Sequence, residues 1–190
     1  MRTTPIALAA LLLLAACPKA AQTAGPAKLR AADYHPLAVG NQWTYQGHDG
    51  KSERTLTISG IKDGFYVFAE DPNGRLKVDA EGLRDDKRYM LHEPLERGKT
   101  WSSIVSVGST EHYEIADTGF TVSTPAGAFN DCVLVRSTNR DAQGRVFKIE
   151  WTYAPNVGLV RLVTSVQVGD REIPQLSEEL KSFKLAKPGP

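Results

Sequence analysis

Hydrophobic and polar residues alternate along much of the chain in short stretches. Leu56 and Ile58 alternate with threonine and serine, and Phe147, Ile149 and Trp151 alternate with charged or polar residues. A period of two residues gives a β-strand one apolar face, whereas helices repeat every 3.6 residues. Helical periodicity is nearly absent, so the sequence predicts half-buried β-strands.

Glycine, proline, asparagine and aspartate separate these stretches at intervals of roughly 8 to 12 residues, as in antiparallel sheets. Hairpin turns are predicted at 48–50, 63–64, 71–74 and 141–144, where glycine can supply a positive φ. Residues 174–185 fit either a helical stripe or a strand, and we predict a strand. We therefore expect an all-β fold, a curved antiparallel sheet or incomplete β-barrel of about ten strands.

One motif occurs twice with the same spacing. Pro36, Leu37, Gly40 and Trp43 recur as Pro94, Leu95, Gly98 and Trp101. The segment 61–67 is similarly echoed by 115–122, so the order of motifs is kept. Proline and glycine would turn the chain into a strand, with leucine and tryptophan packed at its start. The pattern predicts a two-fold internal repeat of a β-meander, with chance similarity as the alternative.

The N-terminus has the parts of a secretory signal, with basic Arg2 before an apolar run from Ile6 to Leu14. The run is shorter than the roughly 20 residues of a membrane-spanning helix. It ends in Leu-Ala-Ala-Cys, which resembles a bacterial lipobox with Cys17 as the lipidated residue. We expect a signal peptide at 1–16, a lipid-anchored flexible tether at 17–33 and a single β domain at 34–186.

The predicted address is the bacterial cell envelope, with the membrane as a partner through lipidated Cys17. Position 18 is Pro rather than Asp, so the commonest inner-membrane retention signal is absent. This favours the periplasmic face of the outer membrane over the inner membrane. An ordinary cleaved signal that happens to contain a cysteine is the alternative.

Charge in the mature chain is balanced. Once Arg2 leaves with the signal, 22 Lys and Arg face 22 Asp and Glu, interspersed rather than segregated. No basic stripe is present, and a nucleic-acid partner is not predicted. The second cysteine, Cys132, lies in an apolar stretch and is predicted to be a buried, unreactive side chain.

Several motifs together resemble a known group of envelope proteins. They are residues 34–37 with Gly40, Trp43 and Tyr45, then 124–129 with Cys132, then 153–160. These look like the recurrent motifs of uncharacterised secreted or lipid-anchored bacterial proteins of the DUF3108 type. The resemblance implies a curved sheet or half-barrel, similar in shape to the lipoprotein carriers LolA and LolB, and it transfers no catalytic residues.

Candidate catalytic groups are sparse. His112 is flanked by Glu111 and Glu114, and His112 and Glu114 could hold a metal if both lie on one face of a strand. A catalytic zinc needs three protein ligands, and the spacing indicates no third. An exposed polar strand is the simpler reading. His35 and His92 are predicted to be turn residues. The acids between 79 and 86 cluster with Arg84, Lys87 and Arg88 and fit a solvated hairpin of mixed charge. We expect no catalytic residues, no metal and no cofactor, and the chain is not predicted to be an enzyme.

Three functions remain open. The first is a binding or structural domain that meets another envelope protein through a sheet face or edge. The second is a carrier of a lipid or other apolar ligand, which needs an apolar cavity of a few hundred Å³. The third is a hydrolase with dispersed Asp, Glu and His. Aromatic residues that would line a ligand site or simply fill the core are Trp43, Tyr45, Phe68, Trp101, Phe147 and Trp151.

Overall fold

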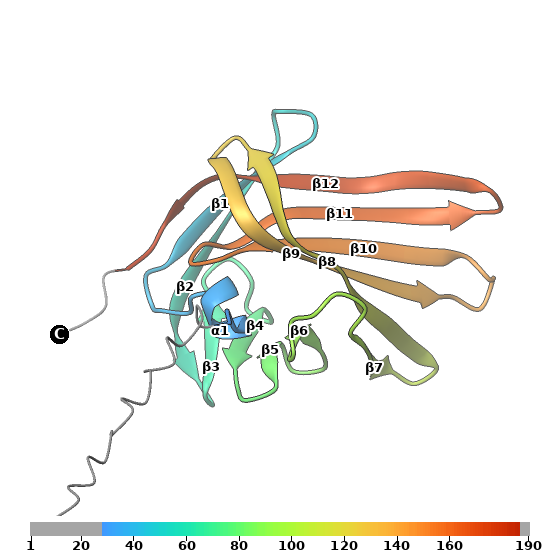
Figure 1. Cartoon of the computed structure of the whole chain (residues 1–190), viewed down its shortest axis with the longest axis horizontal. Coiled ribbons are helices and arrows are strands. Elements are labelled where there is room, and N and C mark those ends of the chain that lie inside the picture. The colour runs from blue at the N-terminus through green and yellow to red at the C-terminus, as the bar shows by residue number, and fades with distance from the viewer. Residues whose placement is uncertain (1–27, 187–190) are drawn as a thin grey trace, which may run out of the picture.

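The computed structural model describes residues 28–186, which form one all-β domain with a short N-terminal helix, α1 (Ala31–Tyr34) (Figure 1). The strands are β1 (Gln42–Gly47), β2 (Glu53–Lys62), β3 (Phe65–Phe68), β4 (Arg75–Val78), β5 (Gly82–Arg84), β6 (Tyr89–His92), β7 (Thr100–Ser106), β8 (Ser109–Thr124), β9 (Gly127–Arg140), β10 (Val146–Ala154), β11 (Gly158–Val168) and β12 (Arg171–Lys184). None of the helices within this range is long and apolar enough to cross a membrane.

All twelve strands belong to one antiparallel sheet, in the order β6-β5-β4-β3-β2-β1-β12-β11-β10-β9-β8-β7. Strands that follow one another in the chain are paired, except β6 and β7, which form the two edges, and β1 also pairs with β12. The sheet curls so that its two edges, β6 and β7, approach one another (Figure 1). The predicted all-β incomplete barrel is confirmed. The prediction of about ten strands falls short because β4, β5 and β6 have only three or four residues each.

The sheet consists of two consecutive six-stranded meanders, β1–β6 and β7–β12, joined by the β1–β12 pair. Each meander begins with the repeated motif, and the repeat extends to the backbone hydrogen bonds. Gly40 N–H donates to Ile58 O at 2.8 Å, and Gly98 N–H donates to Ile115 O at 2.8 Å. Both glycines have positive φ, +92° and +85°. In return, each isoleucine N–H donates to the carbonyl of the residue after its glycine, at 2.9 Å in both halves. The structure therefore confirms the repeat of Pro36–Trp43 as Pro94–Trp101. The predicted echo of 61–67 in 115–122 is wrong, because Ile115 corresponds to Ile58, and 61–67 spans the β2–β3 turn whereas 115–122 lies within β8.

The two meanders differ in strand length. Strands β8, β9 and β12 have 16, 14 and 14 residues, against 3 to 4 residues for β3 to β6. The long strands therefore extend well beyond the short ones (Figure 1). The short meander covers only part of the inner face that the long strands provide.

The segment before β1 fills the interior at one end of the curled sheet. Ala31 and Tyr34 of α1 are buried, and Tyr34 Oη donates to Asp131 O at 2.7 Å. Glu93 accepts a hydrogen bond of 2.8 Å from Ala31 N–H, which ties the start of the helix to the loop after β6. The packed domain thus begins a few residues before position 34, where the sequence places its start.

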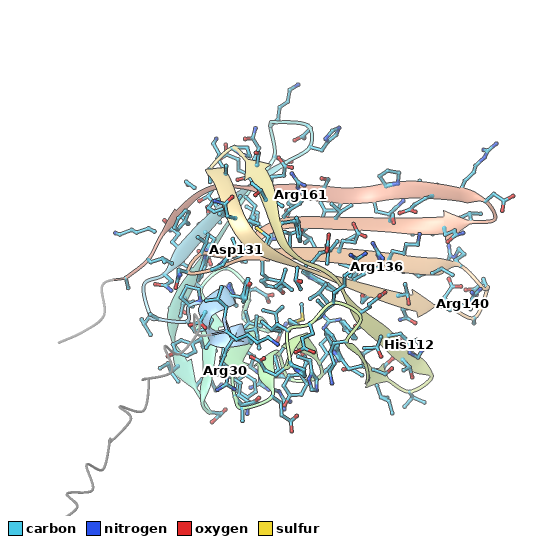
Figure 2. The ribbon with its side chains drawn as sticks, viewed as in Figure 1. Arg30, His112, Asp131, Arg136, Arg140 and Arg161 are labelled. Atoms are coloured by element: carbon cyan, nitrogen blue, oxygen red, sulfur yellow. The ribbon has the colours of Figure 1, made fainter. Side chains whose placement is uncertain are left out.

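Apolar side chains gather on the inner face of the sheet in two adjoining clusters. One is centred on Tyr113, Ile115, Val135 and Trp151, and the other on Trp43, Tyr45, Ile58, Val160 and Leu180. The outer face of the long strands carries charge pairs, including Arg136 with Glu150 and Lys148 with Glu172, both at 2.8 Å. Arg136 is labelled in Figure 2. The alternation of apolar and polar residues in the sequence corresponds to these two faces.

Candidate functional site

The interior contains a cavity of about 170 Å³ between the two meanders. It is lined mainly by apolar side chains: His35, Trp43, Tyr45, Leu56, Phe68, Arg75, Leu76, Leu83, Asp85, Met90, Trp151, Tyr153 and Leu159. We refer to it as the interior cavity. It is smaller than the few hundred Å³ expected of a carrier, because aromatic side chains fill most of the space. An apolar cavity of about 150 Å³ is nevertheless enough to bind benzene.

Four of the predicted aromatic residues, Trp43, Tyr45, Phe68 and Trp151, meet at this cavity. The polar atoms of two of them are satisfied elsewhere. Trp43 Nε1–H donates to Val157 O at 2.6 Å, and Tyr45 Oη–H donates to Leu159 O at 3.1 Å. Burial raises the pKa of Tyr45 well above its usual value. Both rings therefore line the cavity while their polar hydrogens are already bonded to backbone carbonyls.

His35 also lines the interior cavity, and its ring is buried rather than displayed on a turn. It stands in a bend, as predicted, but packs against Trp43 with ring centroids 5.0 Å apart. Its Nδ1 has no hydrogen-bond partner. Burial lowers the pKa of His35 from 6.5 to about 4, so the imidazole is neutral at neutral pH. The sequence offered no signal for this burial, because two neighbours of the ring, Tyr153 and Gly158, flank the distant β10–β11 turn.

An apolar strip leads from the interior cavity along the inner face of the long strands. Strand register aligns Ile149 with Thr164 and Leu176, and Phe147 with Val166 and Ile173. These rows continue the inner face on which Trp151 pairs with Leu162. We define the apolar strip as Phe147, Ile149, Leu162, Val166, Ile173 and Leu176.

The outer half of the apolar strip is open to solvent. Phe147, Ile173 and Leu176 are 37%, 44% and 42% exposed. This is the part of the inner face that the short strands do not cover (Figure 1). Large apolar side chains on the inner face of a sheet are ordinarily buried. A contiguous group of them that stays exposed is a common mark of a binding site.

The curled sheet is held together where its edges approach. Arg88, in the β5–β6 turn, donates from Nη1 to both carboxylate oxygens of Glu111 on β8, at 2.9 and 3.0 Å. Glu111 also accepts a hydrogen bond from Tyr113 Oη. Trp101 of β7 lies against this group, stacked on Tyr113 with ring centroids 5.2 Å apart. Trp101 therefore belongs to the contact between the edges and does not line the interior cavity.

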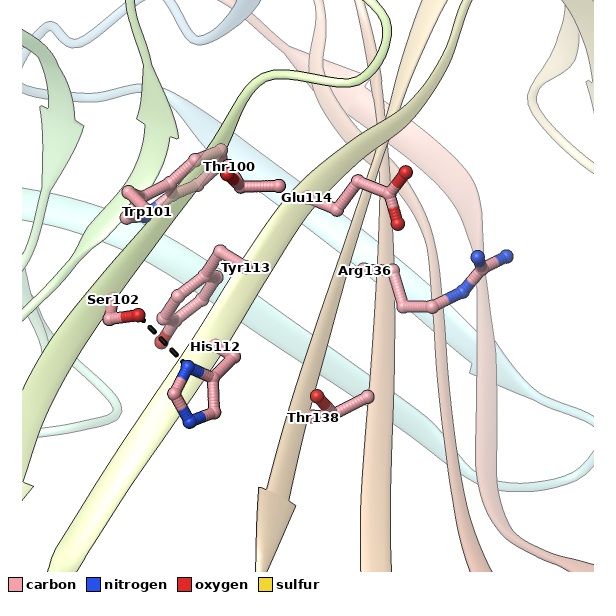
Figure 3. Close-up of a pocket in the computed structure, with 8 residues that line it drawn as sticks. All are labelled: Thr100, Trp101, Ser102, His112, Tyr113, Glu114, Arg136 and Thr138. Atoms are coloured by element: carbon pink, nitrogen blue, oxygen red, sulfur yellow. Dashed lines mark hydrogen bonds between the residues drawn. The ribbon is translucent and has the colours of Figure 1, made fainter.

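A second, polar hollow of about 360 Å³ lies around His112 (Figure 3). Its lining residues are Thr100, Trp101, Ser102, His112, Tyr113, Glu114, Arg136 and Thr138. His112 Nδ1 and Ser102 Oγ are 2.9 Å apart. His112 is exposed, whereas Glu111, one residue earlier, is buried against Arg88 on the other face of the sheet. Glu111 therefore cannot join His112 and Glu114 around one ion.

Metal ligands and carboxylates are otherwise dispersed. Within residues 28–186, no group of three His, Cys, Asp or Glu side chains is arranged to hold a metal ion. Asp79 and Asp85 accept hydrogen bonds from backbone N–H groups of their own turns, and Asp86 pairs with Arg75. These contacts fit the mixed-charge hairpin that the sequence predicts.

Only one of the two cysteines, Cys132, lies within the described residues. Cys132 is buried, as predicted, and its Sγ–H donates to Phe129 O at 3.3 Å. Burial raises the pKa of this thiol, which disfavours the reactive thiolate. Cys17, the predicted lipidation site, lies outside the described residues.

Comparison with known proteins adds little. No protein-family model matches the chain, so the resemblance to the DUF3108 type is not confirmed, and no curated protein matches either. Two solved structures are similar to it. One is a candidate exported protein with a YmcC-like fold from Bacteroides fragilis, with a TM-score of 0.43 and 16% identity over 80% of this chain and 99% of that one. The other is a candidate lipoprotein from Parabacteroides distasonis, with a TM-score of 0.43 and 17% identity over 80% of this chain and 98% of that one. Likeness at this level carries no functional information to this chain.

Proposed function

We propose that this is an envelope protein whose β domain binds a ligand with a long apolar chain, such as a lipid, on the concave face of its sheet. The observation that carries the proposal is the apolar strip, which remains exposed beside an apolar cavity. A binding role without catalysis is the simplest use of such a surface. The alternative of a hydrolase has no comparable support, because Glu111 is paired with Arg88 on the face of the sheet opposite to His112, and Asp85 caps its own turn.

The dimensions of the strip fit an acyl chain. From Tyr153 at the interior cavity to Phe147 near the strand tips, β10 advances six residues, or roughly 20 Å. A lipid tail covers about 15 Å, half the thickness of a bilayer's hydrocarbon core. The strip can therefore accommodate one extended tail, with its end directed into the interior cavity.

The energetics also favour such a ligand. Apolar surface removed from water contributes about 25 cal/mol per Å². The strip and its ligand would each lose exposed apolar area on binding, without any need to pair a buried charge. The neutral imidazole of His35 is consistent with an uncharged ligand end in the cavity.

The N-terminal sequence supports the location. The signal-like run and Leu-Ala-Ala-Cys17 favour export and lipid anchoring, and Pro18 favours the outer membrane over the inner membrane. An anchored β domain would stand close to lipid and to other lipidated proteins.

The test is a titration of the full chain with a fluorescent polyene fatty acid, comparing two adjacent substitutions. Phe147→Glu places a charge on the apolar strip, whereas Val146→Glu places the same charge on the opposite face of β10, where Val146 pairs with Arg140. We expect Phe147→Glu to weaken binding by about tenfold or more, and Val146→Glu to leave it unchanged. Absence of binding by the unmodified chain, or equal effects of the two substitutions, would contradict the proposal.

A further inference from the structure

Strand β7 is an unpaired edge of the sheet. It is the last strand in the sheet order and pairs only with β8 in the described part of the chain. Its link to β6, the opposite edge, is made by a side chain, since Trp101 Nε1–H donates to Tyr89 O at 3.0 Å. Beyond Trp101, the strand extends away from β6 (Figure 1).

The register shows which backbone groups of β7 are free. Ile115 N–H donates to Lys99 O at 2.9 Å, and the following partners are Trp101 with Tyr113 and Ser103 with Glu111. Hydrogen-bonded pairs alternate along an antiparallel ladder. The backbone groups of Trp101 and Ser103 therefore face β8, and those of the residues between and after them, Ser102 and Ile104, face away from the sheet.

The other open edges carry prolines that discourage strand addition, whereas β7 contains none, although its ladder with β8 shifts register between Ile104 and Ser106. Strand β6 has four residues and is soon followed by Pro94. The first half of β12 extends past its partner β1 and contains Pro174. From residue 101 to residue 110 the chain has no proline and no charge. Ile104 is 77% exposed, and the part of β7 before the register shift is an uncharged edge of the kind that serves as a template for another strand.

The internal repeat indicates what the β7 edge can accept. Strand β7 opens the second meander as β1 opens the first, and both carry the equivalent tryptophan. The outer edge of β1 pairs with β12, a strand of 14 residues. The corresponding edge of β7 meets only the short β6, through one side chain. The repeat thus provides a strand-accepting edge that, within residues 28–186, is paired in one half and open in the other.

We propose that β7 pairs with β7 of a second copy of this chain, antiparallel and about a two-fold axis. Such an interface is self-complementary, because the outward N–H groups of each strand donate to the outward C=O groups of the other. The uncharged sequence avoids the repulsion that a charged edge would bring to its own copy. One strand pair is a small interface, and we expect a weak dimer that forms at high local concentration.

The test is sedimentation of the full chain in detergent over a dilution series reaching about 1 mM. Ile104→Pro removes an outward N–H without touching the ladder to β8, and Ile104→Lys adds a charge while keeping that N–H. Ile61→Lys is the matched control, since Ile61 is also exposed, at 60%, but lies near the β2–β3 turn. Thermal unfolding checks that each variant folds.

We expect the unmodified chain and Ile61→Lys to dimerise with the same dissociation constant. Both Ile104 variants should raise this dissociation constant by about tenfold. A monomer at every concentration overturns the proposal, as does a dimer that the Ile104 variants leave intact. A monomer that instead binds an extended segment of another protein at β7 also overturns pairing with a second copy. None of these outcomes bears on ligand binding by the apolar strip, which lies on the inner face.

Discussion

Trp101 Nε1–H donates a hydrogen bond of 3.0 Å to the carbonyl oxygen of Tyr89, and so connects the two edge strands of a single curled sheet. The equivalent residue of the first meander, Trp43, makes the same kind of bond to Val157 O at 2.6 Å. Trp43 therefore bonds β1 to the β10–β11 turn inside the domain, and Trp101 bonds the edge strand β7 to the edge strand β6.

We predict that Trp101→Phe loosens the contact between the edges while keeping most of the ring stacked on Tyr113. Loss of one hydrogen bond to a backbone carbonyl should cost about 1 kcal/mol in the free energy of unfolding. Removal of a whole buried ring should cost more, roughly 3 to 5 kcal/mol for Trp43→Ala. Chemical unfolding measures both, and equal stability of Trp43→Ala and the unmodified chain would show that Trp43 is not a core residue.

Acid should destabilise the domain through His35. The pKa of this residue falls from 6.5 to about 4 on folding, so between these pH values the unfolded chain binds more protons than the folded one. Stability must then decrease as pH falls through this range, by up to about 3 kcal/mol from this group. Unfolding measured at several pH values should show a flatter profile for His35→Gln.

Gly158→Ala should be among the most damaging single-methyl additions. Gly158 has a φ of +117°, and a Cβ there would lie 2.5 Å from His35 Nδ1. Backbone strain and the clash together should cost more than about 2 kcal/mol. Gly60→Ala provides the comparison, because a Cβ at Gly60 meets no atom within 4 Å. A melting temperature equally unaffected by the two changes would mean that the packing around His35 is looser than described.

Cys17→Ala should abolish acylation and leave the β domain folded, because residues 28–186 form the core without it. Mass spectrometry of the intact chain should detect acyl groups on the unmodified protein and none on the variant. A mature protein that begins at an unmodified cysteine would favour the ordinary signal peptide instead.

Much of the fold could be predicted because it rests on local patterns. Alternation identified the strands, and turn residues located the hairpins, including Asp63-Gly64, where both residues adopt positive φ. The repeat was visible as Pro-Leu-x-x-Gly-x-x-Trp, and residues 174–185 lie mostly in β12, as predicted. Such features depend on neighbouring residues and are recorded in the sequence.

The candidate site was harder to predict because it depends on contacts distant in the chain. Pairing of β1 with β12 brings the two meanders together, and no local pattern specifies it. His35 is buried partly by Gly158 and Tyr153, which are far from it in the sequence. The exposed apolar strip results from a difference in strand length between the meanders, so Phe147 could equally have been a core residue. The aromatic residues were identified, but their division between the cavity, the edge contact and the open strip required three-dimensional information.

The most direct test of acyl-chain binding is to purify the full chain under native conditions, extract its non-covalent lipids and count them by mass spectrometry. The apolar strip predicts about one acyl-chain lipid for each chain, the number that its length accommodates. Leu176→Glu, on the strip, should lose this lipid, while Val146→Glu, on the outer face, should retain it. Lipid-free protein, or equal lipid in the two variants, would contradict the account.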